Sequence, residues 1–152
     1  MSSTIIYHWA TIQDAEILAR MNHRLIRDEG HRNPMDIAQL AQRMSDWLSG
    51  QYRAVVFESA QTPVGYALFR PESDHVYLRQ FFVTPNSRRQ GIGREAIQWL
   101  WQNAWSDKPR LRIDVLVGNT VGHKFWESVG FHDYCITMES ETPTPSGNAD
   151  PS

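Results

Sequence analysis

Residues 75–105, HVYLRQFFVTPNSRRQGIGREAIQWLWQNAW, predict a strand, a tight polar loop and a helix, in that order. Aromatic and β-branched residues, which favour strands, fill the first part from His75 to Val83. The following Thr-Pro-Asn-Ser ends the strand, because proline cannot donate to a ladder and Asn and Ser bond their own backbone. Apolar residues then recur at helical spacing, at Ile92, Ala96, Ile97 and Leu100.

The junction between the loop and the helix is suited to bind an anion. A helix start leaves backbone N–H groups unpaired and carries about half a positive charge. Gly91 and Gly93 let an anion approach the backbone, and Arg88, Arg89 and Arg94 add forked cationic donors. Two glycines alone are more often an ordinary helix entry, but the preceding strand, the arginines and the amphipathic helix favour a diphosphate site.

These residues resemble the acyl-CoA-binding motif of the GNAT superfamily of N-acetyltransferases. That motif is Arg or Gln, two residues, Gly, one residue, and Gly or Ala, which fits Arg88, Gly91 and Gly93. A second stretch is similar to a later motif of the family, at Val115, Asn119, Gly122, Phe125, Gly130 and Phe131. The resemblance covers about residues 4–138, and it implies an acetyl-CoA-dependent enzyme.

Length and composition predict one domain over residues 1–138 and a disordered tail over 139–152, where Pro, Ser, Thr, Asn and Asp dominate. A net charge of −2 gives no field that would recruit nucleic acid. The single cysteine excludes an internal disulfide, no apolar run is long enough to span a bilayer, and the N-terminus lacks signal-like features. We therefore expect a cytoplasmic protein without nucleic-acid, membrane or metal partners, and a homodimer is compatible with the sequence.

Patterns along the rest of the chain predict strands at 4–9, 53–58, 64–70, 111–117 and 131–138. One helix should follow a capping box at Thr11–Asp14, a second should start with Asn33 as its cap, and a short one should span 120–129. The order β-α-α-β-β-β-α-β-α-β predicts an α/β (α+β) fold, a mixed sheet with helices on both faces. The GNAT fold has this order, and it implies central strands that splay apart around a wedge for CoA.

The resemblance also implies a cofactor site. The backbone around Phe81 and Val83 would pair with the pantetheine arm like an added strand, and the loop amides would hold the diphosphate. Asn119 sits where the family places a side chain that bonds the pantetheine or orders the wedge. The residues expected to bind acetyl-CoA are Phe81, Phe82, Val83, Arg88, Arg89, Gln90, Gly91, Ile92, Gly93, Arg94, Asn119 and Phe125.

Acetyl transfer also requires a base that takes the proton of the amine. Family members often carry a glutamate on the fourth strand, but here residues 75–80 contain no carboxylate. Asp114 lies five residues before Asn119, where the similar ribosomal-protein alanine acetyltransferases carry a glutamate base. A surface aspartate that pairs with Arg110 or Arg112 is the alternative.

Three further residues are candidate bases: Glu29, His31 and His75. An isolated histidine is more often a surface or hydrogen-bonded residue than a catalyst.

The expected acid is absent, because Trp126 stands where many members have a tyrosine. An indole N–H donates a hydrogen bond but cannot protonate a thiolate. A thiolate with a pKa near the free cysteine value of about 8.5 can leave without a dedicated acid. The departure keeps two alternatives to the enzyme open: a non-catalytic acyl-CoA-binding or regulatory module, and an unrelated nucleotide-phosphate binder.

The resemblance implies that the acceptor, a primary amine of a small molecule or peptide, is bound largely by the loop between the first two helices. That loop reads RDEGHRNP at 27–34, and its adjacent acids favour a cationic amine such as an aminoglycoside, a polyamine or a basic peptide end. A solvated loop whose Asn33 caps the next helix is the alternative. Trp9, Trp47 and Tyr52 could add an aromatic wall, although core packing is the expected role of each.

Overall fold

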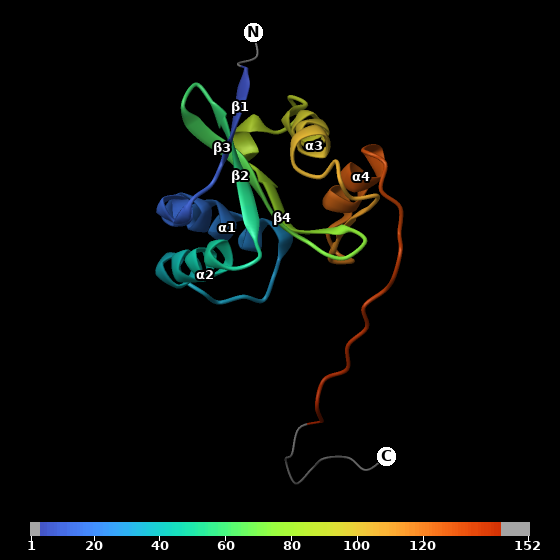
Figure 1. Cartoon of the computed structure of the whole chain (residues 1–152). Coiled ribbons are helices and arrows are strands. Elements are labelled where there is room, and N and C mark those ends of the chain that lie inside the picture. Colours follow the sequence, from blue (N-terminus) through green and yellow to red (C-terminus); the bar gives the residue numbers. More distant parts are fainter. Residues whose placement is uncertain (1–3, 144–152) are drawn as a thin grey trace.

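The computed structural model describes residues 4–143, which form a five-stranded mixed sheet with helices on both faces (Figure 1). The strands lie in the order β1-β2-β3-β4-β5, and the first four are antiparallel to their neighbours, whereas β5 runs parallel to β4. This arrangement confirms the predicted α/β class. The bounds are β1 Ile5–Trp9, β2 Arg53–Ser59, β3 Thr62–Pro71, β4 Val76–Val83 and β5 Leu111–Ile113.

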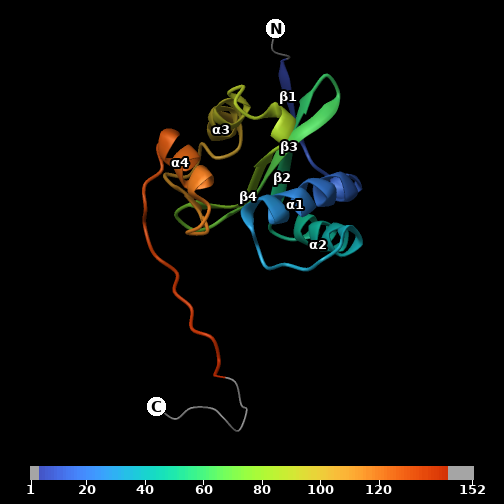
Figure 2. The ribbon, with the colours of Figure 1, turned by 180° about the vertical axis from the view of Figure 1, so that it is seen from behind.

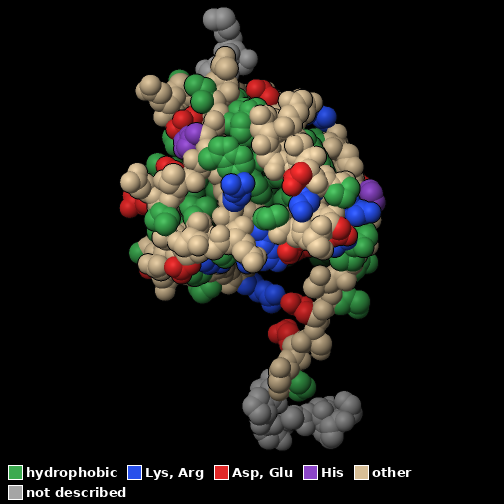
Figure 3. All heavy atoms as spheres, viewed as in Figure 1, with side chains coloured by type: hydrophobic (Ala, Val, Ile, Leu, Met, Phe, Trp, Pro, Cys, Tyr) green, Lys and Arg blue, Asp and Glu red, His purple; other side chains and the backbone are tan. Residues whose placement is uncertain are grey.

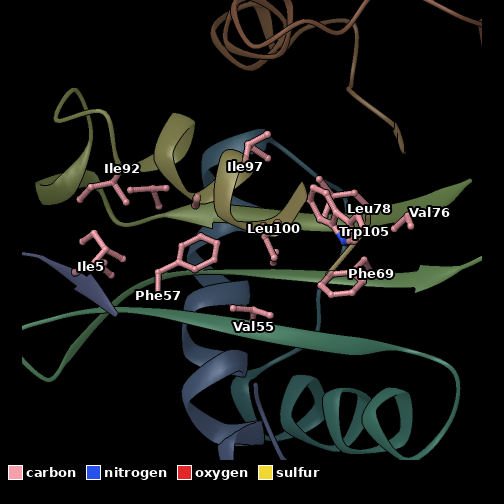
Figure 4. Close-up of a cluster of buried hydrophobic side chains, with 14 of the residues drawn as sticks. Ile5, Val55, Phe57, Phe69, Val76, Leu78, Ile92, Ile97, Leu100 and Trp105 are labelled. Carbon is pink, nitrogen blue, oxygen red and sulfur yellow. The ribbon is translucent and has the colours of Figure 1, made fainter. Parts of the chain in front are cut away.

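Two helices cover each face, and both views show the same pairing (Figures 1 and 2). Helices α1 (Ala15–Glu29) and α2 (Ile37–Ser49) share a core with one face, while α3 (Ile92–Asn103) and α4 (Thr120–Ser128) pack on the other. Short 3-10 turns precede α1 at Ile12–Asp14 and α3 at Pro85–Ser87. Figure 4 shows the core under α3, where apolar side chains of the sheet meet Ile97, Leu100 and Trp105.

Helix starts follow their capping residues. The predicted capping box at Thr11 and Asp14 is confirmed. The predicted start of the second helix at Asn33 is wrong, because Asp36 is the cap and forms a capping box with Gln39. The Asn33 side chain instead accepts from the Met35 N–H at 2.9 Å, the local turn by which asparagine competes with helix formation.

Strand β4 contains a bulge at Arg79, because Leu68 pairs with Gln80 while its neighbour Phe69 pairs with Leu78. A bulge re-aims the residues that follow it. Pairing with β5 ends at Leu78, directly before the bulge. Strands β4 and β5 therefore separate at this point, which is the splay expected from the resemblance.

The prediction is wrong for the last two strands: one is shorter than expected, and the other does not form. The segment predicted at 111–117 is a strand only to Ile113, since β4 offers it no partner beyond the bulge. Residues 131–138 form no strand, and the chain runs away from the body there (Figure 1), with exposed side chains at Tyr134, Ile136 and Met138. A segment of strand-favouring residues does not form a strand where no sheet edge accepts its backbone. Residues 139–143 have no regular structure, and the rest of the expected disordered tail lies outside the described residues.

Acidic and basic side chains are interspersed over the visible surface in Figure 3, and no continuous basic stripe lies on this face. Within residues 4–143, every helix is too short or too polar to cross a bilayer. The cytoplasmic location and the homodimer stay predictions.

Candidate active site

Beyond the bulge, one edge of β4 carries backbone groups that no strand pairs within residues 4–143. The Thr84 N–H donates to the Val64 carbonyl of β3 at 2.8 Å, and successive residues of an antiparallel pair point in alternate directions. Phe82 therefore faces β3, whereas the N–H groups of Phe81 and Val83 point to the side that β5 has left. The structure brings Phe81 and Val83 to the predicted open edge, but it does not bring the backbone of Phe82 there.

The start of α3 has no side-chain cap, in contrast to the starts of α2 and α4. Its cap residue is Gly91, whose φ of 77° lies in the left-handed region that glycine adopts without strain. Within the described chain, the backbone N–H groups of residues 89–94 find no backbone acceptor. Unsatisfied amides at an uncapped helix start are a site that a phosphate group can fill.

Two of the three loop arginines are already held by the protein. Arg88 donates through Nε to the Val83 carbonyl and through Nη2 to Asp28 Oδ2, both at 2.8 Å. Arg94 Nη2 donates to the Ser128 carbonyl at the end of α4, at 2.9 Å. Of the three, only Arg89 makes no side-chain hydrogen bond or ion pair with any part of the chain that the structure describes. Its side chain is therefore the one best placed to meet a phosphate.

Packing requires a glycine at position 93, in addition to the expected approach of an anion to the backbone. A Cβ atom at this position would lie 3.0 Å from the Phe125 ring and 3.7 Å from that of Phe81. The two rings are stacked, with centroids 6.1 Å apart, so Phe125 fills the space between α3 and β4. Phe125 thus shapes the gap beside the loop, and its predicted contact with the cofactor stays a prediction.

Asn119 orders the start of α4. Its Oδ1 accepts from the Gly122 N–H at 3.0 Å, which caps the helix, and its Nδ2 lies 3.5 Å from Glu29 Oε2. The side chain occupies the space where a Cβ of residue 122 would sit, since Nδ2 would then be only 2.4 Å away. This arrangement supports an ordering role for Asn119 at the β5 side of the gap.

Glu29, the last residue of α1, is half-buried and lies beside Asn119. Its Oε1 accepts from His31 Nε2 at 2.9 Å. Burial raises the pKa of the Glu29 carboxyl above its usual value, and the hydrogen bond from His31 opposes that rise. A carboxylate with a raised pKa, beside the point where two strands part, is a candidate general base.

The end of α1 crosses the mouth of the gap between β4 and β5. Asp28 is tied to Arg88 on the β4 side, and Glu29 contacts Asn119 on the β5 side. Glu29 is among the bases that the sequence predicts, but the Asp28–Arg88 pair is not, because nothing in a sequence indicates which acid meets which arginine 60 positions away.

Asp114 does not pair with Arg110 or Arg112, the two partners considered from the sequence. Its Oδ2 accepts from the Tyr77 hydroxyl at 2.9 Å, whereas Arg110 contacts Asp74 and Arg112 contacts Tyr134. Burial, and after it the hydrogen bond to Asp114, raises the pKa of Tyr77 to about 12. The carboxylate of Asp114 lies just past the end of β5, so its catalytic role stays a prediction beside that of Glu29.

The structure also places His75 and Trp126, the two other residues considered for acid–base roles. His75 precedes β4, at the end away from the gap, and its Nδ1 lies 2.8 Å from Asp74 Oδ1. Trp126 is buried, and its ring packs edge-on against Phe81, Phe125 and Phe131. Trp126 therefore fills the core under α4. Within residues 4–143, no three His, Cys, Asp or Glu side chains come together as a metal site.

Comparison with known proteins connects this geometry to a family. The sequence profile of the acetyltransferase (GNAT) family matches residues 17–131. The peptidyl-lysine N-acetyltransferase YiaC of Escherichia coli (strain K12) is 30% identical over 70 residues, which are 46% of this chain and 45% of that protein. The aligned stretch thus spans less than half the length of this curated relative.

Two solved structures share the fold. A possible acetyltransferase from Clostridium difficile 630 superposes with a TM-score of 0.76 at 16% identity, covering 91% of this chain and 97% of that one. The aminoglycoside N-acetyltransferase AAC(6')-Iy in complex with CoA superposes with a TM-score of 0.73 at 15% identity, covering 95% and 98% of the two chains.

Proposed function

The chain belongs to the acetyltransferase (GNAT) family, whose acyl donor is acetyl-CoA, and we propose that it acetylates a primary amine of a small molecule or peptide. One observation carries the proposal. The uncapped start of α3 offers its amides beside the open edge of β4, which is the arrangement needed for a diphosphate joined to an extended arm. The relative named for peptidyl lysine and the neighbour named for aminoglycosides support an amine as the acceptor.

The cofactor would lie along the gap between β4 and β5. Its diphosphate would meet the amides of residues 89–94 and the Arg89 side chain, while its pantetheine arm would pair with Phe81 and Val83. Arg88 occupies the carbonyl of Val83, so the Val83 N–H and the Phe81 carbonyl are the groups left for this pairing. The thioester would then reach the bulge, where the strands part.

Glu29 is the base that the contacts favour. In the proposed step, Glu29 takes a proton from the amine, the amine nitrogen bonds to the acetyl carbon, and the carbon–sulfur bond breaks. The Phe81 N–H, at the open edge, would donate to the oxyanion. CoA leaves as a thiolate, which requires no dedicated acid because its pKa is close to the cysteine value of about 8.5. Asp114, bonded to Tyr77, is the second candidate base.

A thiol-release assay with acetyl-CoA and a panel of primary amines tests the proposal, with acetyl-CoA alone as the blank. Release that saturates with at least one amine supports the enzyme. A non-catalytic acyl-CoA-binding module is the second candidate, favoured by the core tryptophan at position 126. Saturable binding of acetyl-CoA without release for any amine would support that module, and absence of binding would contradict both.

A further inference from the structure

Three arginines from different elements gather on the sheet face that α1 and α2 cover. We name Arg43 of α2, Arg70 of β3 and Arg79 of β4 the arginine cluster. Arg43 and Arg79 both stack on the Trp47 ring, with their Cζ atoms 4.4 and 4.7 Å from its centroid. Arg70 and Arg79 both donate to the Tyr52 hydroxyl, at 3.1 and 3.2 Å.

The charge of the arginine cluster is not balanced by the surrounding chain. Glu72 pairs with Arg70 at 3.1 Å, but Arg43 and Arg79 form no ion pair with any described carboxylate. Burial, and after it the positive charge of Arg79, lowers the pKa of Arg43. Two like charges held near each other without a counter-ion are unfavourable, and an anion between them would offset that cost.

One buried donor of the arginine cluster has no acceptor within residues 4–143. Asn22 of α1 is fully buried, its Oδ1 accepts from Arg43 Nη2 at 3.1 Å, and its side chain also contacts the Tyr66 hydroxyl. Arg43 Nε is buried and finds no acceptor in this part of the chain. Buried donors nearly always have a partner, so this donor indicates a missing acceptor group. A carboxylate oxygen would satisfy it.

The arginine cluster borders the proposed catalytic site. Arg79 is the bulge residue at which β4 parts from β5. Arg43 donates to Asn22 of α1, and Asn22 and Glu29 lie about two helical turns apart on the same face of that helix. The hydroxyl of the buried Tyr66 donates to Gln80, the residue after Arg79, at 2.8 Å. An acceptor at this position can therefore turn one end toward Glu29 and the other toward the arginines.

We propose that the acceptor amine also carries a carboxylate, which Arg43 and Arg79 bind while the amine faces Glu29. The inference rests on the proposed function and names the class of its acceptor: a small amino acid or an amine of similar build. It differs from the cationic acceptor that the loop acids alone favour, since Asp28 is paired with Arg88 and Glu29 with His31.

Matched pairs of acceptors test the inference without requiring turnover. Tyrosine and tyramine, arginine and agmatine, lysine and cadaverine, and histidine and histamine each differ by one carboxylate. We would measure their equilibrium binding by calorimetry in the presence of saturating CoA. In at least one pair the amino acid should bind about tenfold or more tightly than its decarboxylated partner, as expected for a charge-assisted hydrogen bond worth about 1.4 kcal/mol.

Arg79→Gln should reduce that ratio to about one, and because the Arg79 side chain is exposed, the variant should fold. Arg53→Gln is the control, since Arg53 is also an exposed strand arginine stacked on a tryptophan, Trp9, at 5.1 Å. It should keep the ratio. Equal binding within every pair, no binding of any pair, or a ratio unchanged in Arg79→Gln would overturn the inference. Failure of the proposed function is seen separately, as absence of CoA binding or of thiol release with every amine, decarboxylated ones included.

Discussion

Asn119 Nδ2 at the start of α4 lies 3.5 Å from Glu29 Oε2 at the end of α1, although 90 positions separate the two residues in sequence. The contact joins the proposed base to the residue that caps α4 beside the parted strands. A substitution at either residue should therefore change the surroundings of the other. This coupling makes the role of Glu29 testable from two sides.

Glu29→Gln should lower kcat by about a hundredfold or more, as expected when a general base is removed. In the wild type, kcat/KM should fall as the pH drops through the raised pKa of Glu29, because the protonated carboxyl cannot accept the proton. The inflection should lie above the usual glutamate value. Rates measured from about pH 5 to about pH 9 check both the loss of kcat in the variant and the position of the inflection in the wild type.

Asp114→Asn is the matched comparison for this profile. If Glu29 is the base, the acidic limb should survive in Asp114→Asn and disappear in Glu29→Gln. The reverse pattern would assign the base to Asp114.

Asn119→Asp should separate the two roles of this residue. Aspartate is as good a cap as asparagine, so thermal stability should stay close to that of the wild type. Its carboxylate would stand beside Glu29, and a like charge raises the pKa of a neighbouring acid. The acidic limb of the pH profile should therefore move to higher pH.

Asn119→Ala serves as the companion variant, because it loses the cap and should cost about 1 kcal/mol of unfolding free energy, seen in denaturant titration. An Asn119→Asp enzyme with an unshifted profile would argue against Glu29 as the titrating group.

Gly93→Ala should perturb the packing of α3 on Phe125, because the added Cβ would lie 3.0 Å from that ring. We expect a loss of about 1–3 kcal/mol in unfolding free energy, the usual range for overpacking. Gly93→Ala combined with Phe125→Leu should recover part of that loss, which denaturant titration of the three variants measures. Losses that simply add would show that the contact is not the cause.

Arg88→Ala should weaken CoA binding by about tenfold, because it removes the charge-assisted bond that holds the Val83 carbonyl at the open edge of β4. Asp28→Asn gives the discriminating comparison, since it releases Arg88 from its ion pair while keeping the bond to the Val83 carbonyl. We expect Asp28→Asn to bind CoA as well as the wild type does. Equal weakening in both variants would instead assign Arg88 a positioning role through Asp28.

The elements that the sequence predicts well are those specified by local chemistry. The capping box at Thr11, the stripe of α3 and the turn before it depend on residues close together in the chain, so short-range patterns indicate them. The family resemblance, rather than a local pattern, directs attention to Phe81 and Val83, which the structure brings to the open edge of β4; their contact with the cofactor stays a prediction.

The elements that the sequence predicts poorly depend on distant partners. The strand from Leu111 ends early because the bulge at Arg79 takes β4 away from it, and no local pattern indicates that bulge. Residues 131–138 include strand-favouring residues such as Phe131, Tyr134 and Ile136, but they pair with no sheet edge. The arginine cluster and the contact between Glu29 and Asn119 likewise arise only from the folded topology, which joins residues far apart in sequence.

Titration of ¹⁵N-labelled protein with CoA, followed by amide NMR, tests the central claim most directly, because it observes the backbone groups themselves. We expect saturable shifts of the amide resonances of residues 89–94, Phe81 and Val83, and a smaller shift for the Phe82 amide, which faces β3. Shifts that do not saturate, or that fall elsewhere and leave the start of α3 unchanged, would contradict it.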